Sequence, residues 1–299
     1  MRKGLRKMSE MKISGLCKSF GKNNALSDVS LTFRENCIYG LLGRNGAGKT
    51  TLMNIASGRM FPTSGEVTVD GERLCENDRA LGRIHMMGEQ DAFTPGLRVL
   101  HMFKATAGCY PDYDMDYALA LSKEYGLNTK KRLSGLSTGY RTIAKIINAL
   151  ACGAPIVFFD EPVLGLDANH RDMFYRQIIE RYNEHPATFI ISTHLIEEAS
   201  SFIERAAVIK EGRLIMEEET ENIRSMGYTV SGKAADVDRY VLSLDSSSQV
   251  LRTEVLGGLK TASIKGGRGD IPEGLECSPL SLQNMFVCLT GDTERSENK

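Results

Sequence analysis

One glycine-rich segment constrains this chain more than any other part of it. Residues 43–51 read GRNGAGKTT, which satisfies the pattern G-x-x-x-x-G-K-[ST], and they follow the apolar run 37–42. A helical pattern begins directly after the glycines, so the segment has the strand, loop and helix context that the pattern requires. Glycines allow consecutive backbone N–H groups to surround phosphate oxygens, and the helix directs the positive end of its dipole toward them. The segment predicts a loop that binds the phosphates of a nucleoside triphosphate, whereas a chance glycine turn would lack the flanking elements.

Two side chains of this loop are expected to carry most of its chemistry. Lys49 is expected to reach the β- and γ-phosphates, and Thr50 to ligate Mg²⁺. The motif identifies no reaction by itself, because loops of this kind serve GTPases, kinases, motors and transporters. The residues of this segment that we expect to bind the nucleotide are Gly43, Asn45, Gly46, Ala47, Gly48, Lys49, Thr50 and Thr51.

Two adjacent acids follow a second apolar run. Residues 155–159 predict a buried strand, and Asp160 and Glu161 come directly after it. Two neighbouring carboxylates at the edge of a core repel one another unless a cation and a proton-transfer task keep them there. Asp160 is therefore the natural partner of Mg²⁺, and Glu161 can orient and deprotonate an attacking water. The alternative is a solvated acid pair at a strand end.

A histidine closes a third apolar run. The run 188–193 ends at His194, which we expect at the same sheet edge as the glycine loop and Glu161. Ligands bind at the carboxyl edge of open α/β sheets, so His194 can hydrogen-bond the γ-phosphate and position the water. A structural histidine is the alternative, and the lack of a second histidine at helical spacing argues against zinc.

The pattern of apolar and polar residues changes near residue 226. Before it, helical patterns alternate with continuous apolar runs, which are typical of parallel strands buried on both faces and indicate an α/β core. After it, strand-like and helical stretches indicate a small α+β domain. We predict a basic tail over 1–10, a core domain over 11–225, the α+β domain over 226–291 with a last helix near 281–289, and a disordered tail over 292–299.

Composition excludes several classes of protein. The chain has 299 residues, with 37 basic and 38 acidic side chains and a net charge of −1, so its charge balance gives no sign of a nucleic-acid-binding surface. No stretch approaches the ~18 consecutive apolar residues of a membrane span. Seven cysteines without a C-x-x-C pair fit neither a disulfide framework nor a zinc site. We expect a reducing, cytoplasmic compartment, and the basic start lacks the apolar region of a secretion signal.

A third motif makes the pattern specific. Residues 136–141 read LSTGYR and precede an apolar-patterned helix. Together with the motifs above, over about residues 11–225, the chain resembles the ATP-binding cassettes of ABC transporters, whose signature is LSGGQ. The twenty-one residues from Gly139 to Asp160 reproduce the family's usual distance, which rejects a competing register at 133–135.

The resemblance implies a P-loop NTPase (RecA-like) core with a β-subdomain and a helical signature subdomain at about 97–150. It implies that Ser137 and Gly139 contact the γ-phosphate of an ATP held by another subunit. Phe20 matches the aromatic that stacks on adenine, and Asp167 belongs to the loop that communicates across the dimer, so both count among the expected ATP-binding residues. His194 matches the switch histidine of the family.

The chain departs from the family pattern at several positions. Thr138 and Tyr140 replace the commonest signature residues, and Arg44 stands where the family often has proline. In the loop that usually presents a glutamine to Mg²⁺, Glu89 takes the place of the glutamine and Gln90 follows one residue later. Either Glu89 or Gln90 is therefore a candidate metal ligand.

The C-terminal residues 280–291 resemble the tail of the drug- and peptide-exporting branch of bacterial ABC ATPases, although an ordinary amphipathic helix explains the same spacing. The resemblance implies an ATP-hydrolysing subunit of an exporter for a drug, lipid-like or peptide substrate, with ATP and Mg²⁺ as cofactors. It further implies a separate polytopic permease, a second cassette as homodimer or related heterodimer, and a place at the cytoplasmic face of the membrane.

Two alternatives belong to other classes. A soluble ABC ATPase acting on nucleic acid or ribosomes is disfavoured, because the segment 51–136 has no coiled-coil heptads and the net charge is near zero. A non-hydrolysing regulatory cassette is disfavoured by the presence of Glu161 and His194.

Overall fold

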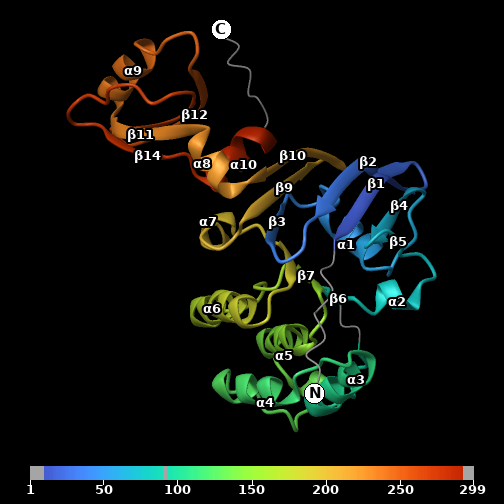
Figure 1. The fold of residues 1–299 in the computed structure, drawn as a ribbon. Coiled ribbons are helices and arrows are strands. Elements are labelled where there is room, and N and C mark those ends of the chain that lie inside the picture. Colours follow the sequence, from blue (N-terminus) through green and yellow to red (C-terminus); the bar gives the residue numbers. More distant parts are fainter. Residues whose placement is uncertain (1–9, 90–92, 292–299) are drawn as a thin grey trace.

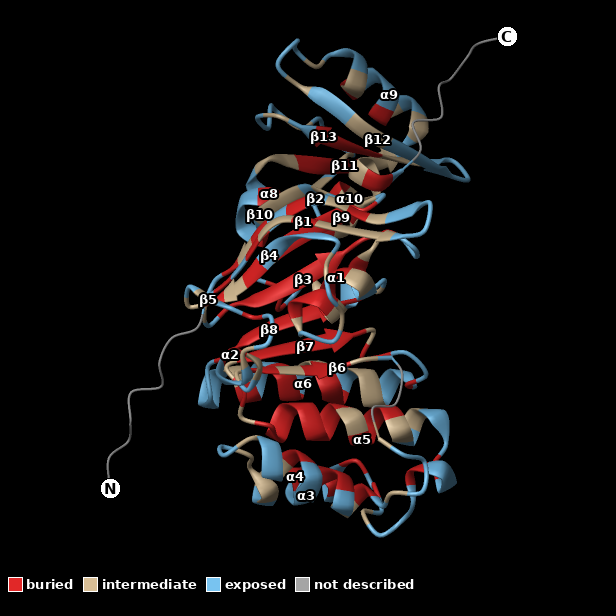
Figure 2. Ribbon diagram, turned by 90° about the vertical axis from the view of Figure 1, so that its right-hand side faces the viewer, coloured by how far each residue is buried: buried red, intermediate tan, exposed pale blue. Residues whose placement is uncertain are grey.

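The protein is described by a computed structural model that covers residues 10–89 and 93–291. Its centre is a six-stranded sheet in the order β10-β9-β3-β8-β7-β6, in which all neighbours are parallel except the edge strand β10 (Figure 1). The strands are β3 (Ile38–Leu42), β6 (Ile84–Met87), β7 (Ile156–Asp160), β8 (Thr188–Ser192), β9 (Arg205–Lys210) and β10 (Arg213–Glu219). Every residue of β3, β7 and β8 is buried, as their continuous apolar runs predicted (Figure 2).

Successive residues of the central strands face two different cores. In β7, Ile156 and Phe158 pack toward α1 (Lys49–Ala56) and a second sheet, whereas Val157 and Phe159 pack toward the helices. The second sheet is antiparallel, in the order β2-β1-β4-β5. Its strands are β1 (Met11–Phe20), β2 (Asn23–Phe33), β4 (Ser64–Val69) and β5 (Glu72–Arg73), and the short α2 (Asp78–Leu81) follows them.

Helices cover the other face of the central sheet. The predicted helical segment 97–150 contains α3 (Val99–Cys109), α4 (Met115–Glu124) and α5 (Thr138–Ala151), with a 3₁₀ turn over Leu133–Gly135. They lie beyond β6, at one end of the molecule (Figure 1). The remaining helices of this part are α6 (Ala168–Glu184), α7 (Ile196–Ala199) and α8 (Thr220–Ser225). The predicted fold class, an α/β P-loop core with a β-subdomain and a helical subdomain, is confirmed.

A separate small sheet lies at the opposite end, beyond β10 (Figure 1). It is antiparallel, in the order β12-β13-β11-β14, and α9 (Ala234–Leu242) packs on it through a core that includes Val230, Val237 and Tyr240. Its strands are β11 (Gly227–Lys233), β12 (Gln249–Leu256), β13 (Leu259–Lys265) and β14 (Glu276–Pro279). The sequence pattern does not predict β14, which is short and mostly exposed.

The last helix, α10 (Leu282–Thr290), returns to the larger part of the molecule. Leu282 and Met285 belong to the core that contains α5 and α6, and α10 contacts α7 and α8. Lys210 Nζ also donates a hydrogen bond to the Leu289 carbonyl at 3.4 Å. The prediction places this helix in the domain 226–291, but in the structure its apolar face covers the larger core. The domain boundaries stay predictions; of the predicted tails 1–10 and 292–299, residues 1–9 and 292–299 lie outside the described residues.

Within the described ranges, no helix has both the length and the apolar character needed to cross a membrane.

Candidate active site

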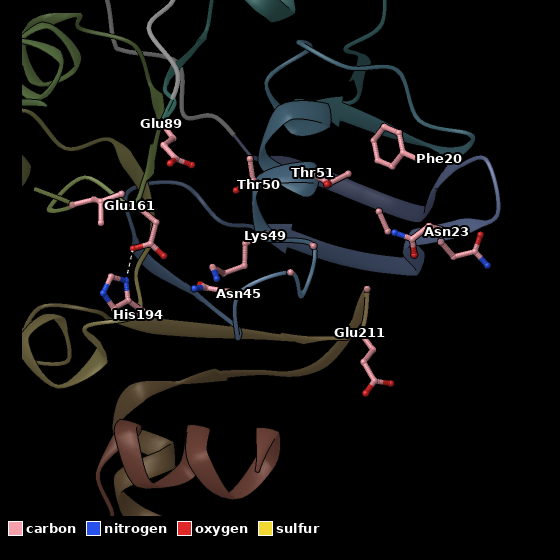
Figure 3. Close-up of a pocket in the computed structure, with 16 residues that line it drawn as sticks. Phe20, Asn23, Asn45, Lys49, Thr50, Thr51, Glu89, Glu161, His194 and Glu211 are labelled. Atoms are coloured by element: carbon pink, nitrogen blue, oxygen red, sulfur yellow. Dashed lines mark hydrogen bonds and ion pairs between the residues drawn. The ribbon is translucent and has the colours of Figure 1, made fainter. Parts of the chain in front are cut away.

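A cleft of about 750 Å³ opens where β3 runs into the glycine loop (Figure 3). Five other segments contribute to it: the end of β1 with the start of β2, the residue Glu89 after β6, the residues after β7, His194 after β8, and the turn between β9 and β10. The predicted site residues that line the cleft are Phe20, Asn45, Gly46, Gly48, Lys49, Thr50, Thr51, Glu89, Glu161 and His194. The structure thus brings together side chains that are far apart in the sequence.

The glycine loop is packed so tightly that Gly48 has no room for a side chain. Its φ is +110°, a left-handed conformation, and a Cβ atom there would lie 2.7 Å from the carbonyl oxygen of Ala25. Gly48 is also the N-cap of α1, so the first N–H groups of this helix face the cleft. Gly43 and Ala47 do not line the cleft, but they form the loop on which it is built.

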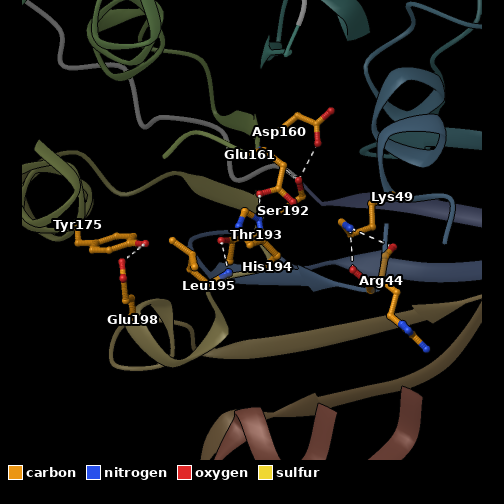
Figure 4. A network of polar contacts seen from close by, with 11 residues as sticks. Arg44, Lys49, Asp160, Glu161, Tyr175, Ser192, Thr193, His194, Leu195 and Glu198 are labelled. Carbon is orange, nitrogen blue, oxygen red and sulfur yellow. Dashed lines mark hydrogen bonds and ion pairs between the residues drawn. The ribbon is translucent and has the colours of Figure 1, made fainter. Parts of the chain in front are cut away.

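Lys49 is folded back onto its own loop. Its Nζ donates hydrogen bonds to the carbonyl oxygens of Gly43 at 2.7 Å and Arg44 at 3.4 Å (Figure 4). Burial lowers the pKa of Lys49, while the negative charges of Glu161 and Asp160 act in the opposite direction. The ammonium group is therefore held by neutral carbonyls, which phosphate oxygens can replace with a stronger, charge-assisted interaction.

Asp160 is a buried carboxylate with one satisfied oxygen. It is 2% exposed, its Oδ1 accepts a hydrogen bond from Ser192 Oγ at 2.7 Å, and Oδ2 has no hydrogen-bond partner among the described residues. An unpartnered buried carboxylate oxygen is costly, and a divalent cation would satisfy it. Thr50 and Glu89 supply further oxygen atoms in the adjoining cleft, and Mg²⁺ prefers oxygen ligands. The residues present fit this ion.

The backbone of Glu161 has an uncommon conformation. Its φ is +47°, and its N–H donates to the Ser192 carbonyl oxygen and to Ser192 Oγ, both at 3.1 Å. A left-handed residue other than glycine costs about 1–2 kcal/mol. The turn directs the carboxylate into the cleft, where Oε2 lies 2.8 Å from His194 Nδ1 (Figure 4). The predicted pair of Glu161 and His194 is thus in direct contact.

Phe20 forms one wall of the cleft and leaves part of its ring open to solvent, with 49% exposure. Lys18 Nζ lies 5.1 Å from the centroid of this ring and donates a hydrogen bond to the Phe61 carbonyl at 2.9 Å. The ring is therefore available for stacking against a flat ligand.

A second group of predicted residues does not line this cleft. Ser137 is the N-cap of α5, and its Oγ accepts a hydrogen bond from the N–H of Tyr140 at 3.4 Å. Asp167 is the N-cap of α6 and accepts from the N–H of His170 at 2.9 Å. Gly139 lies in the first turn of α5. Within one chain, the predicted nucleotide-binding residues thus fall into two separate groups.

The loop after β6 is held by Lys145, whose Nζ donates to the carbonyl oxygens of Gly88 at 3.1 Å and Glu89 at 2.8 Å. Of the two candidate ligands in this loop, Glu89 lines the cleft. Gln90 lies outside the described residues.

Six residues that line the cleft are not among the predicted site residues: Asn23, Asn24, Ala25, Leu164, Glu211 and Gly212. Asn24 Oδ1 accepts a hydrogen bond from Ser19 Oγ at 2.7 Å across the turn after Phe20. The turn at Glu211 is fastened to the glycine loop, because the N–H of Gly212 donates to the Ala47 carbonyl at 2.9 Å. Glu211-Gly212 is a recognisable turn pair, but only the strand order of the sheet places it beside the glycine loop.

Comparison with known proteins identifies the family. Residues 26–164 match the family model described as ABC transporter. The ABC transporter ATP-binding protein NatA of Bacillus subtilis (strain 168) is 31% identical over 199 residues, which cover 64% of this chain and 80% of NatA. The chain belongs to the ABC transporter ATP-binding proteins.

Two further similarities extend this assignment. The bacitracin transport ATP-binding protein BcrA of Bacillus licheniformis is 29% identical over 300 residues, which cover 94% of this chain and 97% of BcrA. The chain is also similar to the ATP-binding cassette MJ0796, whose dimeric structure was solved in a post-hydrolysis state with ADP and Pi. The sequence identity is 26%, the TM-score is 0.62, and the match covers 70% of this chain and 98% of the MJ0796 chain. As an ABC ATPase, this chain binds and hydrolyses ATP, and proteins of this family dimerise and act with membrane permeases.

Proposed function

We propose that this ABC ATPase powers a bacterial exporter of a drug, lipid-like or peptide substrate, whose membrane spans belong to a separate polytopic permease. The support is the similarity to BcrA, a bacitracin transport protein, because it covers 94% of this chain and so includes most of the region after residue 226. In this proposal the chain is bound at the cytoplasmic face of the membrane through that permease. The soluble alternative is not favoured, since the relatives carry transport names.

The observation that carries the catalytic proposal is the contact of Glu161 with His194 beside Lys49 in one cleft. His194 holds Oε2 of Glu161, which leaves Oε1 to accept a proton from the attacking water. The strained backbone of Glu161, anchored by two hydrogen bonds to Ser192, fixes the direction of this carboxylate. Glu161 acts as the general base, and His194 keeps it in position.

The rest of the cleft binds the nucleotide. Lys49 exchanges the carbonyl oxygens of its own loop for phosphate oxygens, and the backbone N–H groups of the glycine loop bind the same phosphates. Phe20 stacks on adenine. Thr50, Asp160 and either Glu89 or Gln90 hold Mg²⁺, which neutralises the phosphate charge when it is bound.

Residues outside the cleft complete the site of a second cassette, identical or related. Ser137, Gly139 and Asp167 do not line the cleft of their own chain, which supports a role on the ATP of the partner cassette. Each helix N-terminus, at α5 and α6, favours a negatively charged group. Hydrolysis then requires two cassettes, each of which completes the site of the other.

Substitution of the base tests the catalytic proposal. Glu161→Gln keeps the size of the side chain and removes its basicity, so kcat should fall by about 10²- to 10⁴-fold while the affinity for ATP is retained. The matched control is Glu197→Gln on α7, an exposed acid that does not line the cleft and should keep the full rate. Steady-state phosphate release and equilibrium binding of ATP measure the two quantities. Hydrolysis by Glu161→Gln at the parent rate would show that another group is the base.

The direction of transport requires the permease. In inside-out vesicles that contain both proteins, an exporter accumulates a labelled peptide such as bacitracin in the lumen when ATP is added outside. Glu161→Gln should abolish this accumulation. ATP-dependent loss of preloaded peptide from the lumen would indicate import and contradict the proposal.

A further inference from the structure

The side chain of His170 contacts both the start of α5, which carries Ser137 and Gly139, and Asp167 at the start of α6. His170 is in the first turn of α6, three residues after the N-cap Asp167. Its Nδ1 lies 2.9 Å from Asp167 Oδ2, while its backbone N–H donates to Asp167 Oδ1 at 2.9 Å. Both carboxylate oxygens of Asp167 are therefore engaged by a single residue. The hydrogen bonds from His170 lower the pKa of Asp167 and so favour its charged form.

The same imidazole packs between two tyrosines from other helices. The ring of Tyr125, at the C-terminal end of α4, is stacked on it with centroids 6.0 Å apart and an interplanar angle of 12°. The ring of Tyr140, in the first turn of α5, meets it edge-on with centroids 6.1 Å apart and an angle of 65°. The side chain of His170 is 22% exposed, so it is enclosed on several sides. One side chain thus connects α4, α5 and α6.

The backbones of these segments also approach closely. A Cβ atom on Gly139 would lie 3.0 Å from the carbonyl oxygen of Gly165, and Thr142 Oγ1 donates to the Leu164 carbonyl at 3.4 Å. The first turn of α5 therefore packs directly on the loop 164–167. These contacts set the distance between the backbones, but neither of them involves the Asp167 carboxylate, whose side chain is 66% exposed.

We propose that His170 is a positioning residue, which holds Asp167 and the signature segment (residues 136–141) as one preformed surface for the ATP of the second cassette. The inference rests on the two-cassette site proposed above. Groups that meet a ligand across an interface must be held to within a fraction of an ångström, and a side chain fixed by packing and hydrogen bonds achieves this. The contact also gives a structural role to Tyr140, which stands where the family signature LSGGQ has glutamine.

The test measures ATP-driven association of the full chain in the Glu161→Gln background, where slow hydrolysis preserves the ATP-bound state. Sedimentation velocity over a range of chain concentrations gives the association constant, and equilibrium dialysis with labelled ATP at low chain concentration gives the affinity of the single chain. His170→Ala should weaken association about tenfold, because it removes an aromatic contact and a hydrogen bond to a charged group. The affinity of the single chain for ATP should change by less than about twofold, since His170 does not line the cleft.

Two conservative variants separate the contributions. His170→Asn keeps a donor close to the position of Nδ1 and loses the ring, whereas His170→Phe keeps the ring and loses the donor; each should restore part of the association. The matched control is His185→Ala, at the C-terminal end of the same helix, which should associate as the parent does. In a double-variant cycle with Tyr140→Ala, the effects of the two alanine substitutions should be less than additive.

The outcomes distinguish this inference from the proposed function. Ser137→Arg places a bulky charge at the N-terminus of α5 and should abolish association if the two-cassette site is right. If Ser137→Arg abolishes it and His170→Ala associates as the parent does, the role of His170 is refuted and the proposed function stands. If Ser137→Arg associates normally, the two-cassette site is refuted. Equal losses of association and of single-chain ATP affinity in all three His170 variants would show general structural damage and overturn the inference.

Discussion

The packing of α10 predicts that Leu282 stabilises the ATPase core and not the small C-terminal sheet. Its side chain is 1% exposed and belongs to the same core as α5 and α6. Substitution of a buried leucine by alanine costs about 2–5 kcal/mol, and the value increases with the cavity that remains. We therefore expect Leu282→Ala to lower the free energy of unfolding by about 3 kcal/mol.

Urea unfolding followed by two probes measures this effect. Loss of bound fluorescent ATP analogue reports on the ATPase core, and far-ultraviolet circular dichroism reports on all helices and strands. With a urea slope near the top of the usual range, about 3 kcal/mol per molar, the midpoint of nucleotide loss should fall by about 1 M. The control is Leu242→Ala on α9, where leucine is 86% exposed and the change should stay within about 0.5 kcal/mol. Equal midpoints of nucleotide loss for the two variants would refute the packing of α10 on the ATPase core.

Two further predictions concern single residues. Gly48→Ala places a Cβ atom 2.7 Å from the Ala25 carbonyl oxygen, at a residue with a left-handed backbone. Titration calorimetry should therefore show that the affinity for ATP is at least tenfold weaker, and an unchanged affinity would contradict the loop geometry. Burial, aided by the charge of Arg59, lowers the pKa of His85 to about 4, so the unfolded chain takes up a proton that the folded chain does not as the pH falls from 6.5 toward 4. This contribution to stability is present above pH 6.5 and is lost as the pH falls from 6.5 toward 4. The free energy of unfolding in urea should therefore differ between pH 7.5 and pH 4.5, and His85→Gln should reduce that difference by about 2 kcal/mol. An identical pH dependence in both proteins would refute this prediction.

The strands of the central sheet could be predicted because their burial on both faces requires a simple sequence pattern. A parallel strand covered on both faces must be apolar throughout, as in β7 and β8. Residues at the carboxyl ends of such strands share one sheet edge, so the meeting of Glu161 and His194 also followed from the pattern. These predictions succeed because each depends on a local pattern and one general rule of sheet geometry.

Other features depend on which surfaces meet, and no local pattern specifies that. The amphipathic pattern of α10 shows that one face is buried, but it does not say whether the small sheet or the ATPase core covers it. The strand β14 is short and mostly exposed, so it lacks the apolar alternation that identifies strands. The contact of His170 with Tyr140 joins two helices whose packing was not predicted, although both residues were visible in the sequence.

The position of α10 links the C-terminal region to both sides of the active site. The helix α10 contacts α7, which begins two residues after His194. At its end, Leu289 accepts a hydrogen bond from Lys210, which precedes Glu211 of the cleft, and Thr290 lines a small cavity of about 290 Å³ together with the glycine loop. The helix is also joined to the small sheet, since it contacts β12 and Asn284 Nδ2 donates to Thr229 Oγ1 at 3.3 Å. Through α10 the small sheet is therefore in packing contact with the segment that follows His194 and lies close to the glycine loop.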